Sequence, residues 1–267
     1  MSAMPTVPER ETEPTGSFAP NPGAAPRRRM LAAQTGMEFR LLLRNGEQVG
    51  LTLVIPLLLL FFFNLPLLYS LGVARRIQFV VPSIIALAVM SSAFTGLAIG
   101  TGFERKYAVL KRLGATALPR SVLVGGKTLS VLLMEIVQVV AIVLVGLVLA
   151  WHPTGDPVLV AVLVVLGTAS FGGLGLLVAG TMRAEVILAV ANLVWLVLLF
   201  AGGIAIPLSK YPHSVARVLQ YLPSAALSDG LHAVMQHSRG IPVHDLLTLL
   251  VWAAVALPAA ARFFRWE

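Results

Sequence analysis

The residue in the chain best placed to do chemistry is a carboxylate inside an apolar run. Glu135 stands near the middle of residues 122–150, and Gln138 follows one helical turn later. An ionisable group in a membrane-length apolar segment indicates a functional site by default, because its burial is costly. The alternative is a structural role, in which Glu135 is protonated or hydrogen-bonded to a neighbouring helix. The sequence slightly favours the structural role, because no chain of intramembrane carboxylates or histidines accompanies it.

A second chemical candidate is the sequence GGKT at residues 125–128, which matches the end of a phosphate-binding loop. The full loop has the pattern Gly-x-x-x-x-Gly-Lys-Ser/Thr and follows a strand. Ser121 occupies the place of the first glycine, and no strand is predicted before it. We therefore predict no nucleotide site in this chain, so ATP-driven work would require another chain that binds ATP.

Metal and nucleophilic chemistry find little support in the remaining residues. The five histidines all fall on the predicted outer side, where solvated positions are the better interpretation, and none forms a His-Glu-x-x-His pattern. The chain contains no cysteine, which excludes disulfides and thiolate nucleophiles. The run GTASFGG at residues 167–173 lacks the Gly-x-Ser-x-Gly pattern of a nucleophile elbow. Its small residues are more typical of helices that approach each other closely.

The composition indicates what kind of protein must position these residues. Hydrophobic residues make up 57% of the chain and charged residues 12%, and the mean hydropathy is +0.86. A soluble domain carries about 25% charged residues and could not bury so much apolar surface at this length. We predict an all-α integral membrane protein. The net charge of +8 does not indicate nucleic-acid binding, because the basic residues lie at the ends of apolar runs.

Six apolar segments are long enough to cross a membrane, which takes roughly 20 residues. They are residues 49–69, 79–100, 122–150, 158–180, 186–206 and 246–263. With six spans both termini lie on one side, which then holds 15 of the lysines and arginines against 5 on the other. The positive-inside rule places that richer side in the cytoplasm.

The segments outside the spans have their own patterns. Residues 1–28 are rich in Pro, Ala, Thr and Glu and predict a disordered cytoplasmic tail before a transmembrane domain at residues 29–267. Residues 27–48 predict a basic, partly amphipathic helix on the inner leaflet, with a plain membrane-proximal stop as the alternative. Between the fifth and sixth spans, Pro223 divides two short helices that predict an outer cap or re-entrant hairpin.

The most charged segment, GFERKYAVLKRLGATALPR at residues 102–120, joins the second and third spans. Phe103, Tyr107, Leu110 and Gly114 fall on one stripe of a predicted helix that ends at Gly114, and Pro119 begins the next element. The other positions are mostly charged: Glu104, Arg105, Lys106, Lys111 and Arg112. An apolar stripe with charged flanks is suited to a groove on another protein. The alternative is an anchor that lies on lipid headgroups.

The sequence here resembles a known family. FERKYAVLKRLGATALPR, the helix before the first span and GGIAIPLSKYPHSVARVLQYLPSAALSDGLHAV are together similar to the ABC type-2 exporter permeases. The resemblance covers about residues 30–265. It departs from the expected pattern at Arg75 and Arg76, which place positive charge in a predicted outer loop.

The resemblance implies a bacterial inner-membrane exporter subunit for lipid, drug or glycan-type substrates. Such a subunit pairs with separate ABC ATPase subunits, which bind ATP and Mg²⁺, and with a second permease copy or a homologous permease. The residues it implies for ATPase contact are Glu104, Arg105, Tyr107, Leu110, Lys111 and Arg112. No cofactor is expected in this chain, and membrane lipid is the other expected partner. The alternatives are an ATP-independent secondary transporter or channel and, less favoured, an intramembrane enzyme.

Overall fold

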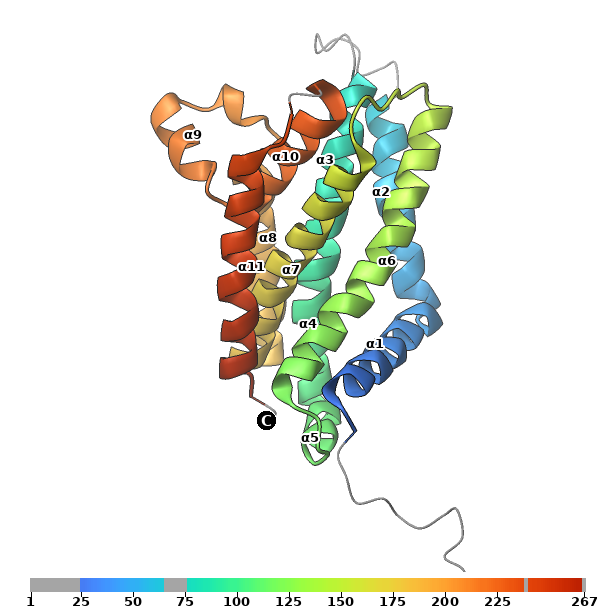
Figure 1. The fold of residues 1–267 in the computed structure, drawn as a ribbon, viewed down its shortest axis with the longest axis vertical. Coiled ribbons are helices and arrows are strands. Elements are labelled where there is room, and N and C mark those ends of the chain that lie inside the picture. Colours follow the sequence, from blue (N-terminus) through green and yellow to red (C-terminus); the bar gives the residue numbers. More distant parts are fainter. Residues whose placement is uncertain (1–24, 65–75, 238–239, 266–267) are drawn as a thin grey trace, which may run out of the picture.

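The chain forms a bundle of long helices that run roughly side by side (Figure 1). The computed structural model describes residues 25–64, 76–237 and 240–265, and no strand occurs in these ranges. The predicted tail falls almost entirely outside them. The longer helices are α1 (Arg27–Arg44), α2 (Gly46–Asn64), α3 (Arg76–Met90), α4 (Leu97–Lys106), α6 (Arg120–Val148), α7 (Pro157–Thr181), α8 (Ala184–Ala201), α10 (Pro223–His237) and α11 (Val243–Phe263). The short elements are the π-helical segment η2 (Ser91–Gly96), α5 (Val109–Gly114), the 3₁₀ turn η3 (Leu208–Lys210) and α9 (His213–Leu219).

Within the described ranges, five helical segments are long and apolar enough to cross a membrane. They are Ile77–Lys106, which joins α3, η2 and α4, together with α6, α7, α8 and α11. Helix α1 and residues Val49–Phe63 of α2 meet at a 69° bend and make a sixth span only if the bent pair crosses as one. Five of the six spans predicted from the sequence therefore correspond to helical segments of membrane-spanning length. The end of the predicted first span, beyond residue 64, lies outside the described residues.

Local signals explain most helix ends. The Asp156 side chain accepts a hydrogen bond from the Val158 amide (2.8 Å) and so caps the start of α7. Helix α8 ends at Ala201, five residues before the predicted end of the fifth span. A β-carbon at Gly202 would collide with the Ser224 side chain, and Gly203 adopts a φ of +72°. The close contact with α10 and the left-handed turn together end the helix there.

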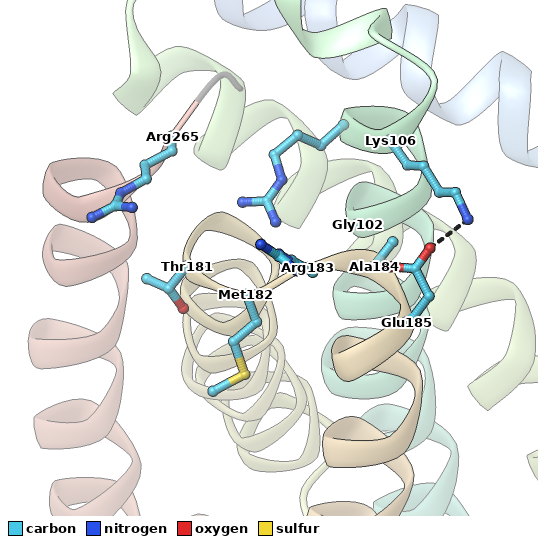
Figure 2. Close-up of a pocket in the computed structure, with 9 residues that line it drawn as sticks. Gly102, Lys106, Thr181, Met182, Arg183, Ala184, Glu185 and Arg265 are labelled. Atoms are coloured by element: carbon cyan, nitrogen blue, oxygen red, sulfur yellow. Dashed lines mark hydrogen bonds and ion pairs between the residues drawn. The ribbon is translucent and has the colours of Figure 1, made fainter.

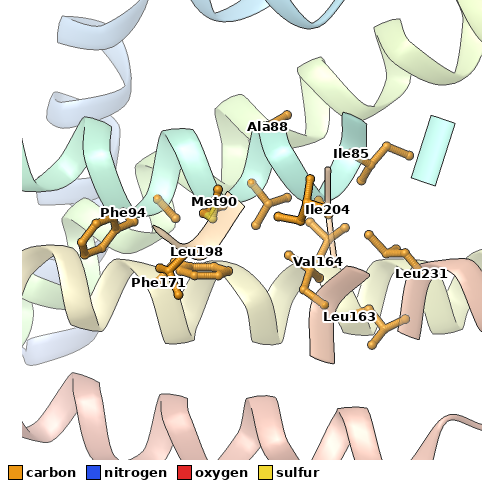
Figure 3. Packing of buried hydrophobic residues seen from close by; sticks show 14 of the residues in the cluster. Ile85, Ala88, Met90, Phe94, Leu163, Val164, Phe171, Leu198, Ile204 and Leu231 are labelled. Atoms are coloured by element: carbon orange, nitrogen blue, oxygen red, sulfur yellow. The ribbon is translucent and has the colours of Figure 1, made fainter. Parts of the chain in front are cut away.

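Helix α7 lies at the centre of the bundle, and its small residues let other helices come close. Its large side chains, including Leu163 and Phe171, pack against Ile85, Met90 and Phe94 of α3 and η2 (Figure 3). A β-carbon at Gly173 would come within 2.8 Å of the α11 backbone, and one at Gly175 within 2.6 Å of the Phe94 carbonyl oxygen. The prediction that glycines in this span serve close packing is confirmed.

The segment between α8 and α11 contains two short helices divided at Pro223, as predicted. Helix α10 is packed inside the bundle against α3, α7 and α11, and Leu227 and Leu231 are fully buried. Helix α9 stands away from the bundle, with Val218 70% exposed (Figure 1). We call this end of the bundle the α9 end. The opposite end, which carries α5, the start of α1, the α7–α8 connection and the end of α11, is the α5 end.

Candidate functional site

The charged segment at the α5 end is divided into two helices, which corrects the prediction of one continuous helix. Helix α4 carries the second span on to Lys106, and α5 begins at Val109. Between them Ala108 has a φ of 58°, a left-handed conformation that costs a residue with a β-carbon roughly 1–2 kcal/mol. Tyr107 and Leu110 therefore do not share one stripe.

Burial of Leu110 accounts for this break. Its side chain is fully buried in a small cluster with Leu123 of α6 and Phe264, which follows α11. Full burial of a leucine contributes roughly 1.5–3 kcal/mol, enough to offset the left-handed residue. The cluster holds α5 against two other helices. Leu110 thus positions α5, and its surface is unavailable to a partner, contrary to its predicted contact role.

The other predicted contact residues differ sharply in exposure. Tyr107 is 68% exposed, and Lys111 and Arg112 are exposed on α5. Arg105 is half-buried and lines a cleft beside the α7–α8 connection. Glu104 faces the bundle. The segment therefore presents an outward surface around Tyr107 and an inward surface around Glu104.

On the inward side, Glu104 belongs to a buried ion cluster formed with Lys127 of α6 and Glu38 of α1. Lys127 Nζ lies 2.7 Å from Glu104 Oε2 and 3.0 Å from Glu38 Oε1. Gln34 Nε2 donates a further hydrogen bond of 2.7 Å to Glu38 Oε1. Lys127 and Glu38 are almost fully buried, whereas the Glu104 side chain is 31% exposed. We call these four residues the Lys127 cluster.

Two glycines explain how α1 reaches α6 at this point. A β-carbon at Gly126 would lie 2.6 Å from Gln34 Cγ, and one at Gly125 would lie 3.2 Å from Leu31 Cδ1. The sequence GGKT therefore lies inside helix α6, where its glycines make room for α1 and its lysine pairs with Glu38. Helix α1 turns its polar residues Gln34 and Glu38 toward the protein, so its buried face is not the apolar one.

A cavity of about 190 Å³ opens beside the Lys127 cluster. Its polar lining comes from Glu38, Asn45, Thr101, Glu104, Lys127 and Ser130, and its remaining walls are apolar side chains and glycines. The cavity lies where α1, α4 and α6 meet. A shift of α4 would therefore change the distances within the cluster directly.

The two polar residues predicted inside the third span, Glu135 and Gln138, have surroundings unlike those of the Lys127 cluster. Glu135 is fully buried and accepts a hydrogen bond from the Thr168 hydroxyl of α7. Its other oxygen, Oε1, has no hydrogen-bond partner among the described residues. Gln138 instead joins α2 and η2, because its Nε2 donates to the Thr52 carbonyl (3.0 Å) and its Oε1 accepts from Ser92 Oγ (3.2 Å). The two predicted residues are neighbours on α6, but they serve different helix contacts.

The polar contacts around Gln138 include the π-helical segment. Ser91 Oγ accepts a hydrogen bond from Trp195 Nε1 of α8 (2.9 Å), and Ser92 contacts α6. A π turn inside a helix often marks a functional position. Here it lies within the span Ile77–Lys106, between the Lys127 cluster and the α9 end.

Comparison with known proteins identifies the family of the chain. The family model described as ABC-2 family transporter protein matches residues 72–262, which is most of the chain. The chain belongs to the ABC-2 transporter family. A search of curated proteins gives no significant match.

In this permease, the sequence predicted the exposed Tyr107 surface and the buried Glu135, but it missed the Lys127 cluster. Glu38 and Lys127 were not predicted as site residues, and Glu104 was assigned to an outside partner. The available signal was the pair Gly125–Gly126 directly before a lysine in an apolar helix. That pattern indicates a close helix approach next to a buried charge.

Proposed function

We propose that this permease is the membrane subunit of an ATP-driven exporter and that separate ABC ATPase subunits dock on α5. The observation that carries the proposal is the outward surface around Tyr107, which lies directly before α5, the helix that the buried Leu110 holds against α6. Val109, which is 42% exposed, adds apolar surface, and Lys111 and Arg112 supply charge. An exposed aromatic ringed by polar residues is typical of an energetically important interface residue.

The Lys127 cluster offers a route from that surface into the spans. Only Tyr107 and Ala108 separate α4 from α5, so a push on α5 acts on α4 and on Glu104. Glu104 pairs with Lys127 of α6, which also pairs with Glu38 of α1. We infer that α1, α4 and α6 move together when the ATPase subunits change shape on ATP binding. ATP and Mg²⁺ belong to those subunits.

Location and assembly follow from the same proposal. The α5 end faces the cytoplasm of a bacterial inner membrane, and both termini lie on that side. Helix α1 lies at the inner leaflet, and η3, α9 and α10 form the outer hairpin. A second permease copy or a homologous permease completes the path, with membrane lipid around it. Exposed apolar side chains on α2, α6, α8 and α11 supply surface for both contacts.

The substrate class proposed is a lipid, drug or glycan-type molecule. The alternative function is an ATP-independent secondary transporter or channel, for which Glu135 is the residue of interest. The two functions differ in whether transport requires ATP hydrolysis by a partner or an ion gradient.

The decisive experiment is purification of the permease with the ATPase subunit that accompanies it, followed by transport-coupled ATP hydrolysis. We expect Tyr107→Ala to lower ATPase retention and coupled hydrolysis while membrane insertion stays normal. Tyr221→Ala is the matched control, since Tyr221 is 59% exposed at the α9 end. Normal coupling in Tyr107→Ala would contradict the docking surface. Transport that continues without any ATPase would contradict the exporter function itself.

A further inference from the structure

A second cleft at the α5 end gathers basic side chains from three separate parts of the chain. It measures about 490 Å³ and lies between the end of α4, the α7–α8 connection and the residues that follow α11 (Figure 2). Its charged lining consists of Arg105, Lys106, Arg183, Glu185 and Arg265. We call it the arginine cleft.

The charges in the arginine cleft are unbalanced. Glu185, the one carboxylate among the described residues that line the cleft, pairs with Lys106 at 2.5 Å (Figure 2). Arg105, Arg183 and Arg265 form no ion pair with another described residue. Three guanidinium groups around one cleft repel each other unless an anion lies between them. Planar guanidinium groups bind phosphate oxygens in pairs, so phosphate suits this arrangement.

The fold brings these arginines together by close backbone contacts. A β-carbon at Gly102 would lie 2.6 Å from Ile187 Cδ1, so glycine at this position lets α4 approach α8 and carries Arg105 to the cleft. On the other side, buried Phe264 packs against Gly180, and the Arg265 amide donates to the Gly180 carbonyl (3.3 Å). The cleft is therefore built from ordered segments of the bundle.

The depth of the cleft distinguishes a lipid from a soluble anion. Arg105 lies in the last turn of its span, Arg183 directly precedes α8, and Arg265 follows α11 by two residues. All three positions correspond to the headgroup level of a membrane. Met182, 37% exposed, lines the same cleft, and exposed Val186 continues an apolar surface along α8. A charged pocket above an apolar wall matches a phospholipid better than free phosphate.

We propose that the arginine cleft binds the phosphate headgroup of an anionic phospholipid in the leaflet at the α5 end. Basic pockets between membrane helices on the cytoplasmic side are a recognised setting for anionic headgroups. Arg183 and Arg265 contact the phosphate, Arg105 adds positive charge from the end of α4, and the acyl chains lie along Met182 and α8. The site does not depend on the ATPase partner.

The test uses the purified full-length permease in mixed micelles that contain phosphatidylglycerol or phosphatidylcholine. Lipid retention is measured by native mass spectrometry, and the unfolding midpoint is recorded as each lipid is added. We expect phosphatidylglycerol to be retained and to raise the midpoint, and phosphatidylcholine to do neither. The double variant Arg183→Gln/Arg265→Gln should bind phosphatidylglycerol at least tenfold more weakly. Arg28→Gln/Arg120→Gln, which removes two exposed arginines at the same end and outside the docking surface, is the matched control.

Several results would overturn the proposal. Equal retention of both lipids would reduce the cleft to an apolar groove, and full displacement of phosphatidylglycerol by millimolar inorganic phosphate would indicate a site for soluble anions. Unchanged lipid binding in the double variant, together with lost ATPase retention, would assign the cleft to an acidic protein segment. If the double variant fails to fold, the salt dependence of wild-type binding decides, because headgroup binding to arginines must weaken as salt rises.

Discussion

Two buried polar centres on α6 use carboxylates in different ways. At Lys127, two carboxylates from α1 and α4 surround one cation close to the α5 end. At Glu135, two turns further along the same helix, a single carboxyl group contacts one hydroxyl of α7 and no cation among the described residues. Glu104 retains 31% of its side-chain exposure, whereas Glu135 retains none. Separated charges are thus placed at the edge of the bundle, and hydrogen bonds alone at its centre.

The difference follows from the cost of burying charge. An ion pair recovers its desolvation cost only with good geometry and further hydrogen bonds, and the Lys127 cluster has both. In the middle of a membrane the cost of burying a charge is greater. A single hydrogen bond from a hydroxyl group offsets only the smaller cost of burying a weakly polar group. We therefore expect the two centres to respond unequally when a charge is removed.

The largest effect is expected from Lys127→Met. The variant leaves Glu38 and Glu104 close together without a cation, and breaking a buried pair in this way costs about 3–5 kcal/mol. The free energy of unfolding of the purified protein measures the loss. Lys210→Met, which replaces an exposed lysine at the α9 end, should change it little. The triple variant Glu38→Gln/Glu104→Gln/Lys127→Met should recover most of the stability. A single variant as stable as its Lys210→Met control would show that the cluster does not hold α1 and α4 to α6.

An intermediate effect is expected from Asp229 of α10, a carboxylate at the α9 end that has no lysine or arginine ion-pair partner among the described residues. Burial, followed by the negative charge of Asp245, raises the pKa of Asp229 from 3.8 to about 6. The folded protein then binds more protons than the unfolded chain between these values, so stability falls as the pH rises from about 4 to 6. Asp229→Asn should remove this fall, worth up to about 3 kcal/mol.

The measurement is the unfolding midpoint of wild type and Asp229→Asn from pH 4 to 7. Asp156→Asn is the control, because asparagine also caps helix α7 and Asp156 is exposed. Parallel pH profiles for wild type and Asp229→Asn would contradict a raised pKa of this half-buried carboxyl group.

The smallest effect is expected from Glu135→Gln. The amide oxygen can accept the Thr168 hydrogen bond in place of the carboxylate, so stability should change by less than about 1 kcal/mol. Assembly is measured as the yield of monodisperse protein and its unfolding midpoint. Failure of the Glu135→Gln variant to fold would show that the charge itself is structural. Lost transport in a normally folded variant would instead favour a functional carboxylate.

The sequence predicted the parts of the fold that depend on local pattern. Apolar length located five spans, Gly114 and Pro119 located the end of α5 and the start of α6, and Pro223 divided the two short helices. Each of these signals acts within a few residues. The left-handed residue Ala108 gave no such signal, because it is imposed by the burial of Leu110 against Leu123 and Phe264, which are distant in sequence.

The Lys127 cluster was beyond sequence reasoning for the same reason. Glu38, Glu104 and Lys127 come from three helices, and which faces meet depends on how the helices rotate and cross. The hydropathy pattern determines neither how a helix rotates about its axis nor how it crosses its neighbours. Helix α1 shows this well, because its amphipathic pattern predicts an apolar face toward the membrane but gives no sign that the bundle buries Gln34 and Glu38.

The π turn of η2 gives the second span one residue more than a regular helix of the same length would hold there. Each residue of an α-helix advances the chain by about 100° around the axis. If Ser91–Gly96 were wound as regular α-helix with no residue removed, the extra residue would turn α4 by that angle relative to α3. Glu104 would then rotate away from Lys127, and Arg105 away from the arginine cleft. A wide turn that moves along a helix rotates the residues it passes by about 100° and leaves the rest packed, so η2 can re-aim part of this span without unfolding it.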